Sequence, residues 1–147
     1  MTNPPFDANL QLRIIEDWLN QSKASVTAAG PTEEDIISRS VVNRAFNAMY
    51  LCIATILDVN ACVLPYAYNI YYRYFYCVQQ NLLQYRGVYI FGRLDKFFDE
   101  RKKADYDLVK NHFTYVRAQA AIRDAREIIR EFETACRNKL SNEGHLC

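Results

Sequence analysis

The segment VVNRAFNAMYLCIATIL, residues 41–57, contains one charged side chain, Arg44. Its large apolar residues recur at helical spacing and so fall within one stripe of a helix. This stripe consists of Val42, Phe46, Met49, Ile53, Ile56 and Leu57. The opposite side of the same helix holds Arg44, Asn47, Ala48, Leu51 and Thr55. The wider stretch 41–92 adds only Asp58, Arg73 and Arg86 to Arg44. A stretch this poor in charge is either the centre of the fold or an interface between chains.

Signals on either side of this segment extend the helix. Gly30-Pro31 is a signal that ends the preceding helix, and Thr32 is a suitable residue to begin the next one. The acidic residues 33–35 then lie where the positive end of the helix dipole favours them. We therefore expect a helix from Thr32 to about Leu57. We expect this helix to be too short and too interrupted by polar residues to cross a bilayer, and hence no membrane partner.

Other parts of the chain also favour helices. The first should run from about Asn9 to Ala28, another should begin near Gly92 and reach about Glu100, and the last should cover Val109 to Leu140. Their expected apolar faces are Leu10, Ile14, Trp18 and Leu19 in the first, Leu94, Phe97 and Phe98 in the second, and Ala118, Ile122, Ala125, Ile129, Phe132 and Cys136 in the last.

The segment YAYNIYYRYFYCV, residues 66–78, has an ambiguous period. Its aromatic residues favour a strand, but a single strand would have no sheet to join, so we expect a helix. The chain is then an all-α, up-and-down bundle of four or five helices. It forms one domain over residues 1–140, followed by a flexible tail over residues 141–147.

Composition limits the function classes. Half of the 147 residues are apolar, which excludes a disordered chain. The formal charge is only +1, so no overall electrostatic field indicates binding to nucleic acid or to a membrane. The five cysteines include no Cys-x-x-Cys pair, and with two histidines we expect no metal site and no cofactor. The residues MTNPPFDANL have no basic or apolar signal region. These features favour a cytoplasmic protein with reduced thiols.

Common enzyme motifs do not occur in this sequence. There is no GxGxxG, no P-loop and no HExxH. His145 lies in the expected tail, and His112 has no nucleophile signature beside it. The usual hydrolase and nucleotide-fold interpretations are therefore excluded at the level of motifs.

Cationic residues are the remaining candidates for a site. Arg44 needs either an ion pair or a cleft, because an unpaired buried cation costs several kcal/mol, and a phosphate contact is one use of such a cleft. The run Arg101-Lys102-Lys103 is by itself a solvated helix end. The arginines of the last helix, with Glu127 and Glu131 beside them, are by themselves a salt-bridged surface. These arginines are Arg123, Arg126, Arg130 and Arg137. The tyrosines of residues 66–76 are more suited to packing than to stacking on bases.

Two segments together resemble the HEPN superfamily of small helical proteins. NRAFNAMY, residues 43–50, is similar to the family's SRAYYAMF-type helix, and RKKADYD, residues 101–107, is similar to its R-K-x-A-D-Y-D segment. Gly87-Val88 lies between them as in the family's H-K-G-V turn. The resemblance covers about residues 32–132.

The resemblance implies a dimeric helical bundle, often a metal-independent ribonuclease toxin paired with a nucleotidyltransferase-type antitoxin. In the family an Arg stabilises the phosphorane, and a His that follows after four to six intervening residues assists proton transfer. Arg44 matches the family Arg, but Leu51 stands in the position of the His. The resemblance places Asn47, Tyr50 and Arg101 with Arg44 in an RNA- or nucleotide-binding cleft. It also makes Ala104, Asp105 and Tyr106 a structural motif, in which Asp105 orders the turn between two helices.

Three functions follow from these expectations. The first is a dimeric HEPN-like protein that binds RNA or a nucleotidyltransferase-type partner, with weak or no cleavage because leucine cannot transfer a proton. The second is a non-enzymatic dimeric interaction or scaffolding module. The third is an active metal-independent endoribonuclease whose catalytic residues are displaced.

Overall fold

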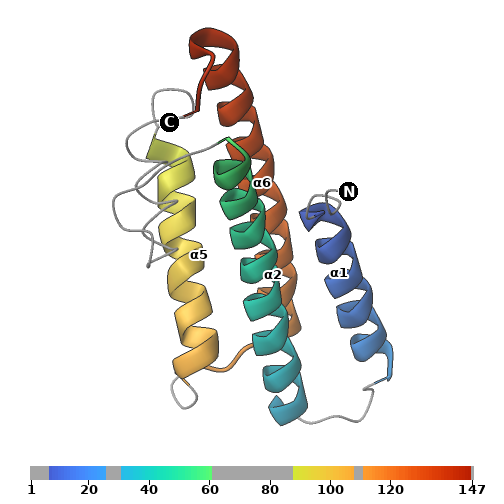
Figure 1. The fold of residues 1–147 in the computed structure, drawn as a ribbon. Coiled ribbons are helices and arrows are strands. Elements are labelled where there is room, and N and C mark those ends of the chain that lie inside the picture. Colours follow the sequence, from blue (N-terminus) through green and yellow to red (C-terminus); the bar gives the residue numbers. More distant parts are fainter. Residues whose placement is uncertain (1–6, 26–30, 61–87, 108–110, 147) are drawn as a thin grey trace.

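The computed structural model describes residues 7–25, 31–60, 88–107 and 111–146 (Figure 1). These residues form four helices: α1 (Ala8–Ser25), α2 (Pro31–Val59), α5 (Val88–Tyr106) and α6 (Tyr115–Glu143). The part of the chain that is described contains no strand, which confirms the all-α prediction. The helix expected over residues 66–78 lies outside the described residues.

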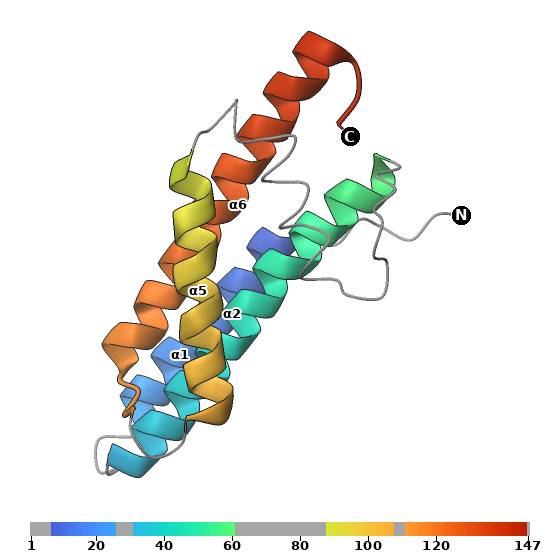
Figure 2. The same ribbon diagram turned by 90° about the vertical axis from the view of Figure 1, so that its left-hand side faces the viewer.

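The two longest helices, α2 and α6, pack along each other at the centre of the bundle. Helix α1 packs on one side of this pair and α5 on the other (Figures 1 and 2). Successive helices run in opposite directions, so the arrangement is up-and-down. Helix α2 contacts all three of the other described helices, which agrees with a charge-poor segment at the centre of the fold.

The predicted apolar stripes of the two central helices form the core. In α2, five of the six stripe residues are buried, and Ile56 packs against the core from a half-buried position. All six residues of the predicted α6 seam are buried. Leu94 and Phe97 of α5 are buried as well, with Phe98 packed beside them. These stripes were predictable because each helix has only one continuous row of large apolar side chains.

The prediction for α1 was wrong about its buried face. Leu10 and Ile14 are 43% and 52% exposed, and of the predicted residues only Leu19 is fully buried. The core-facing row is instead Ala8, Leu12, Ile15 and Leu19. The sequence offers two overlapping rows at helical spacing, and contact with α2 and α6 selects the second one.

Both ends of α6 differ from the predicted range. Residues 111–114 are not helical, because Thr114 has an extended backbone and its hydroxyl accepts a hydrogen bond from the backbone N–H of Arg117 at 3.3 Å, as an N-cap does. At the other end the helix continues to Glu143, and Gly144 ends it with a left-handed backbone (φ 76°). Leu146 is only 1% exposed. Helix α6 thus includes residues 141–143, and Leu146 beyond it packs in the core.

Helix α2 is also longer than the sequence suggested. Its span Thr32–Val59 is long and apolar enough to cross a membrane by length and composition alone, so the expectation that it is too short was wrong. Half of its most apolar window is buried inside the bundle. Core helices of soluble proteins share these properties with membrane spans.

Candidate functional site

Three residues of α2 that the sequence placed together do share one exposed face. Arg44, Asn47 and Leu51 are separated by three and four residues, so they lie above one another on the helix. All three are exposed, with Leu51 at 45%. They line one hollow of about 230 Å³ between α1 and α2, here called the α1–α2 hollow. Its other lining residues are Gln11, Ile14, Ile15 and Ala48.

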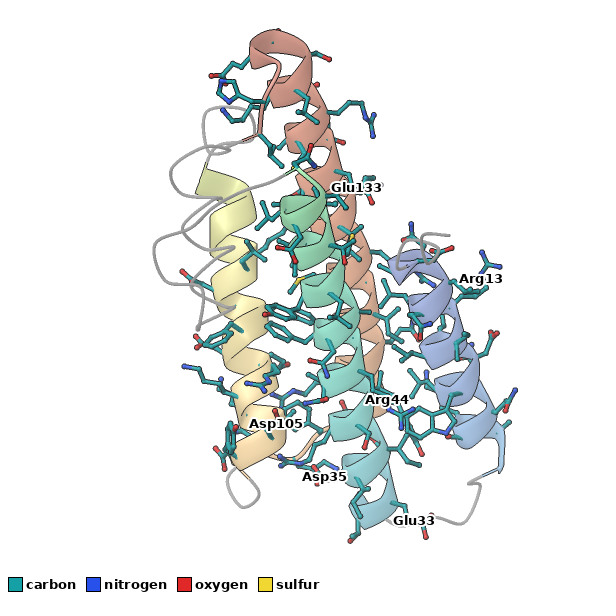
Figure 3. All side chains as sticks on the ribbon, viewed as in Figure 1. Arg13, Glu33, Asp35, Arg44, Asp105 and Glu133 are labelled. Carbon is teal, nitrogen blue, oxygen red and sulfur yellow. The ribbon has the colours of Figure 1, made fainter. Side chains whose placement is uncertain are left out.

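Arg44 projects from α2 toward α1 (Figure 3). Its guanidinium carbon lies 4.9 Å from the centre of the Trp18 ring of α1, within the range of a cation–π contact. Within the described ranges Arg44 forms no ion pair. The guanidinium is thus held against an aromatic ring while its hydrogen-bond donors stay accessible to an anion.

Arg44 also borders a second hollow, on the α5 side of α2. This α2–α5 hollow has a volume of about 270 Å³. It is lined by Arg39, Ser40, Asn43, Arg44, Ala104 and Asp105. Arg44 is the residue common to the two linings.

A chain of polar contacts crosses from α5 to the exposed face of α2. Arg101 pairs with Asp105 at 2.9 Å, and both carboxylate oxygens of Asp105 accept hydrogen bonds from the amide of Asn43 at 2.8 and 3.0 Å. Asn47 in turn donates its amide hydrogen to Oδ1 of Asn43 at 3.1 Å. Asp105 projects from α5 toward α2 (Figure 3). It therefore joins the C-terminal part of α5 to α2.

Two predicted site residues do not reach the α1–α2 hollow. Tyr50 stacks on Phe46 with ring centres 6.4 Å apart, and the Phe46 ring also packs against Phe97 and Phe98 of α5. Arg101 lies over the same Phe46 ring at 5.7 Å. Arg101 therefore belongs to the α2–α5 contact. Tyr50 lies away from the hollow because, at 100° per residue, position 50 points about 90° away from the row of Arg44, Asn47 and Leu51.

The remaining two motif residues have different surroundings. Ala104 is buried, and its small side chain lets α5 approach α2 closely. Tyr106 is 74% exposed at the last position of α5. Among these motif residues, Asp105 is the one whose side chain makes the α2 contact described above.

The buried arginine of α2 is Arg39, which the sequence analysis did not single out. It is 8% exposed and donates to Asp35 at 2.8 Å, to the carbonyl oxygens of Lys103 and Ala104 at 2.9 and 3.0 Å, and to the carbonyl of Asn111. These carbonyls belong to the end of α5 and to the chain beyond it. Arg39 thus satisfies acceptors that the end of a helix leaves without partners. Its four-residue spacing from Asp35 was the one available signal.

Asp35, one of the acidic residues at the start of α2, also has a tertiary role. One of its oxygens accepts the backbone N–H of Phe113 at 2.7 Å, while Glu34 accepts the N–H of Tyr115 at 3.2 Å. Burial would raise the pKa of Asp35, but the hydrogen bonds from Phe113 and Arg39 outweigh it, so its pKa lies below the ordinary value of 3.8. The start of α2 therefore holds the start of α6.

Among the described residues, no histidine or cysteine lines either hollow. Neither His112 nor His145 lines them, and His112 lies 3.8 Å from Asp35 at the far end of α2. Burial, with the Glu133 carboxylate 3.9 Å away, raises the pKa of Cys52 to about 12, so this thiol stays protonated and unreactive at neutral pH. Within the described ranges no cluster of potential ligands could hold a metal ion.

The arginines of α6 pair differently from the expected pattern. Arg126 binds both carboxylate oxygens of Glu16 in α1 at 3.1 Å, and this hydrogen bonding lowers the pKa of Glu16. Glu127 pairs with Arg93 of α5. The ion pairs therefore join α6 to α1 and to α5.

The comparisons with known proteins give no relative for this arrangement. No protein-family model, curated protein or solved structure matches the chain. The candidate site is accordingly defined by its own geometry: one stacked, exposed arginine between two hollows, with an amide and an aliphatic side chain on the same helix face.

Proposed function

We propose that this chain binds RNA through the exposed α2 face formed by Arg44, Asn47 and Leu51, and that it cleaves RNA weakly or not at all. In this proposal it is a HEPN-like protein in which Leu51 replaces the family histidine. The main support for the proposal is the environment of the Arg44 side chain. It lies on the Trp18 ring, exposed and without an ion pair among the described residues, between two hollows.

The chemistry of the α1–α2 hollow supports an anionic ligand. No carboxylate lines it, and Arg44 is its only formal charge among the described residues. A guanidinium matches two phosphate oxygens at once. The amides of Gln11 and Asn47 and the aliphatic walls suit a sugar or base attached to that phosphate.

Weak cleavage follows from the same lining. General acid–base catalysis typically contributes about 10²–10⁴-fold to a rate. Among the described residues no histidine or cysteine lines either hollow, and the carboxylate of Asp105 is engaged by Arg101 and Asn43. Arg44 would still stabilise a phosphate, so binding persists where cleavage fails.

The test measures binding and cleavage of a short, labelled single-stranded RNA without divalent metal. We expect Arg44→Ala to weaken binding about tenfold or more and to reduce the salt slope of the binding constant by about one. Arg13→Ala is the matched control, since Arg13 is exposed on α1 and projects away from Arg44 (Figure 3). RNA binding also changes the fluorescence of Trp18, the single tryptophan of the chain. Equal affinities of wild type and Arg44→Ala would contradict the proposal.

A second candidate function rests on the apolar walls of the same hollow. Ile14 and Leu51 are each about half exposed on opposite walls. A dimeric interaction module would cover them with a second copy of the chain or with a nucleotidyltransferase-type partner. Assembly without any Arg44-dependent RNA binding would favour this candidate.

A further inference from the structure

The series of hydrogen bonds that links Asp105, Asn43 and Asn47 can run in only one donor-to-acceptor direction. The ionised carboxylate of Asp105 accepts hydrogen bonds and cannot donate them, so Asn43 must turn its NH2 group toward Asp105. The carbonyl oxygen of Asn43 then faces Asn47 and accepts from its NH2 group at 3.1 Å. The order of donors is therefore set by the one charged acceptor at the α5 end.

This direction determines what Asn47 presents to a ligand. One amide hydrogen of Asn47 is used on Asn43, and its Oδ1 accepts no hydrogen bond from any described residue. Asn47 is exposed and lines the α1–α2 hollow. Because its NH2 group is held on the Asn43 side, Asn47 offers an oriented hydrogen-bond acceptor.

The acceptor lies one helical turn from the guanidinium of Arg44. Side chains three residues apart on a helix have Cβ atoms about 5–6 Å apart. The 2′-hydroxyl and the 3′-phosphate of one ribose are neighbours on the same ring and can span such a pair. The hydroxyl is a donor and the phosphate an anion, so they complement an acceptor beside a cation.

We propose that Asn47 makes this site prefer RNA over DNA, by accepting the ribose 2′-hydroxyl of a nucleotide whose phosphate is bound by Arg44. Asn43 acts as a positioning residue, since it holds the Asn47 amide in the required orientation. The inference rests on the RNA-binding function proposed above, and it identifies the ribose 2′-hydroxyl as the group that the site recognises. A 2′-hydroxyl is what distinguishes RNA from DNA at a given position.

The size of the preference follows from the value of one hydrogen bond. Deoxyribose lacks the donor, so the Asn47 acceptor returns to water when DNA binds. A net hydrogen bond corresponds to about three- to tenfold in affinity. Single-stranded RNA should therefore bind the wild-type chain about three- to tenfold more tightly than DNA of the same sequence.

The experiment compares RNA, DNA and 2′-fluoro RNA of one sequence, with fluorescence anisotropy as the readout. The 2′-fluoro strand keeps an RNA-like sugar pucker but has no donor, so it should bind like DNA. Asn47→Ala should reduce RNA affinity to the DNA value and leave DNA affinity unchanged. Asn43→Ala should lower the RNA-to-DNA ratio in the same direction, because the Asn47 amide is then free to turn. Circular dichroism confirms that each variant is helical.

The outcomes separate this inference from the function on which it rests. If Arg44→Ala weakens RNA and DNA equally while Asn47→Ala leaves the RNA-to-DNA ratio unchanged, RNA binding stands and the role of Asn47 is rejected. A 2′-fluoro strand that binds as tightly as RNA also rejects it, since sugar shape would then explain the preference. If Arg44→Ala has no effect on either strand, the proposed function itself fails. Asn47 is exposed, so Asn47→Ala decides the matter even where Asn43→Ala does not fold.

Discussion

At the scale of single residues, two arginines of α2 show how burial decides a role. Arg39 and Arg44 are five positions apart, yet Arg39 is 8% exposed and bound to three backbone carbonyls while Arg44 is exposed on the Trp18 ring. The first therefore anchors the structure and the second is accessible to ligands. Neither role follows from the identity of the residue, because both depend on what the neighbouring helices place beside it.

Replacement of Arg39 should destabilise the fold strongly. Arg39→Ala leaves the Asp35 carboxylate and the carbonyls at the end of α5 without their donor, and breaking a buried pair costs about 3–5 kcal/mol. Urea denaturation measures this loss in the free energy of unfolding. Arg13→Ala is the control and should change it by less than about 0.5 kcal/mol. A similarly small change for Arg39→Ala would disprove the anchoring role.

Leu51 is the position at which the proposed loss of catalysis can be reversed. The side chain is 45% exposed beside Arg44, so a histidine fits there without disturbing the core. We expect Leu51→His to introduce metal-independent RNA cleavage, with a gain within the range of about 10²–10⁴-fold that acid–base groups supply. Gel analysis of labelled RNA measures it, and Leu51→His with Arg44→Ala is the control. A variant that binds RNA but never cleaves it would refute this expectation.

At the scale of helices, carboxylates of α2 and α5 hold neighbouring segments at fixed positions. Asp35 accepts the N–H of Phe113 and the guanidinium of Arg39, and Asp105 binds Asn43 across the α2–α5 contact. The sequence indicated that these acids stand near helix ends. Phe113 and Asn43, the partners on neighbouring segments, lie more than sixty residues away along the chain, which local patterns cannot reveal.

Acid should weaken the contact between α2 and the start of α6. The pKa of Asp35 is lowered in the folded chain, so its ionised form contributes stability above its ordinary value of 3.8, and this contribution is lost as the pH falls through the lowered value. We expect the free energy of unfolding to decrease more steeply below about pH 4 in wild type than in Asp35→Asn. Denaturant titrations across this range measure the slope. Parallel slopes for the two proteins would contradict it.

Asp105→Ala should destabilise the bundle by about 1–3 kcal/mol, because it removes two hydrogen bonds to Asn43 and the ion pair with Arg101. Thermal unfolding followed by circular dichroism measures the effect. The control is Asp99→Ala, an exposed acid on the same helix. Unchanged melting combined with lost RNA binding would instead assign Asp105 to the ligand.

At the scale of the whole molecule, α2 is covered by three helices and most of its apolar side chains are buried within one chain. The charge-poor segment 41–57 is therefore explained chiefly as the centre of the fold. What remains exposed on its α1 side is Leu51, with Ile14 facing it across the α1–α2 hollow. Any dimer built on the Arg44 face would be centred there.

We expect the chain to form a homodimer through this face. Light scattering at micromolar concentration should give twice the monomer mass of 17.2 kDa. Ile14→Arg should yield the monomer, since it places a cation next to Arg44 in the interface. Ile36→Arg is the matched control, because Ile36 is a 59% exposed apolar residue of α2 outside both hollows. A wild-type chain that remains monomeric would exclude the dimer.

The sequence by itself determined the four described helices, the buried stripes of α2 and α6, and the shared face of Arg44, Asn47 and Leu51. These features depend only on helical spacing within one segment. Only the tertiary structure decided which row of α1 is buried, that Tyr50 stacks on Phe46, that Trp18 supports Arg44, and that Arg39 is the buried arginine of α2. Each of these depends on which helix lies opposite, and burial and pairing energies are set by neighbours in space that the local sequence does not contain.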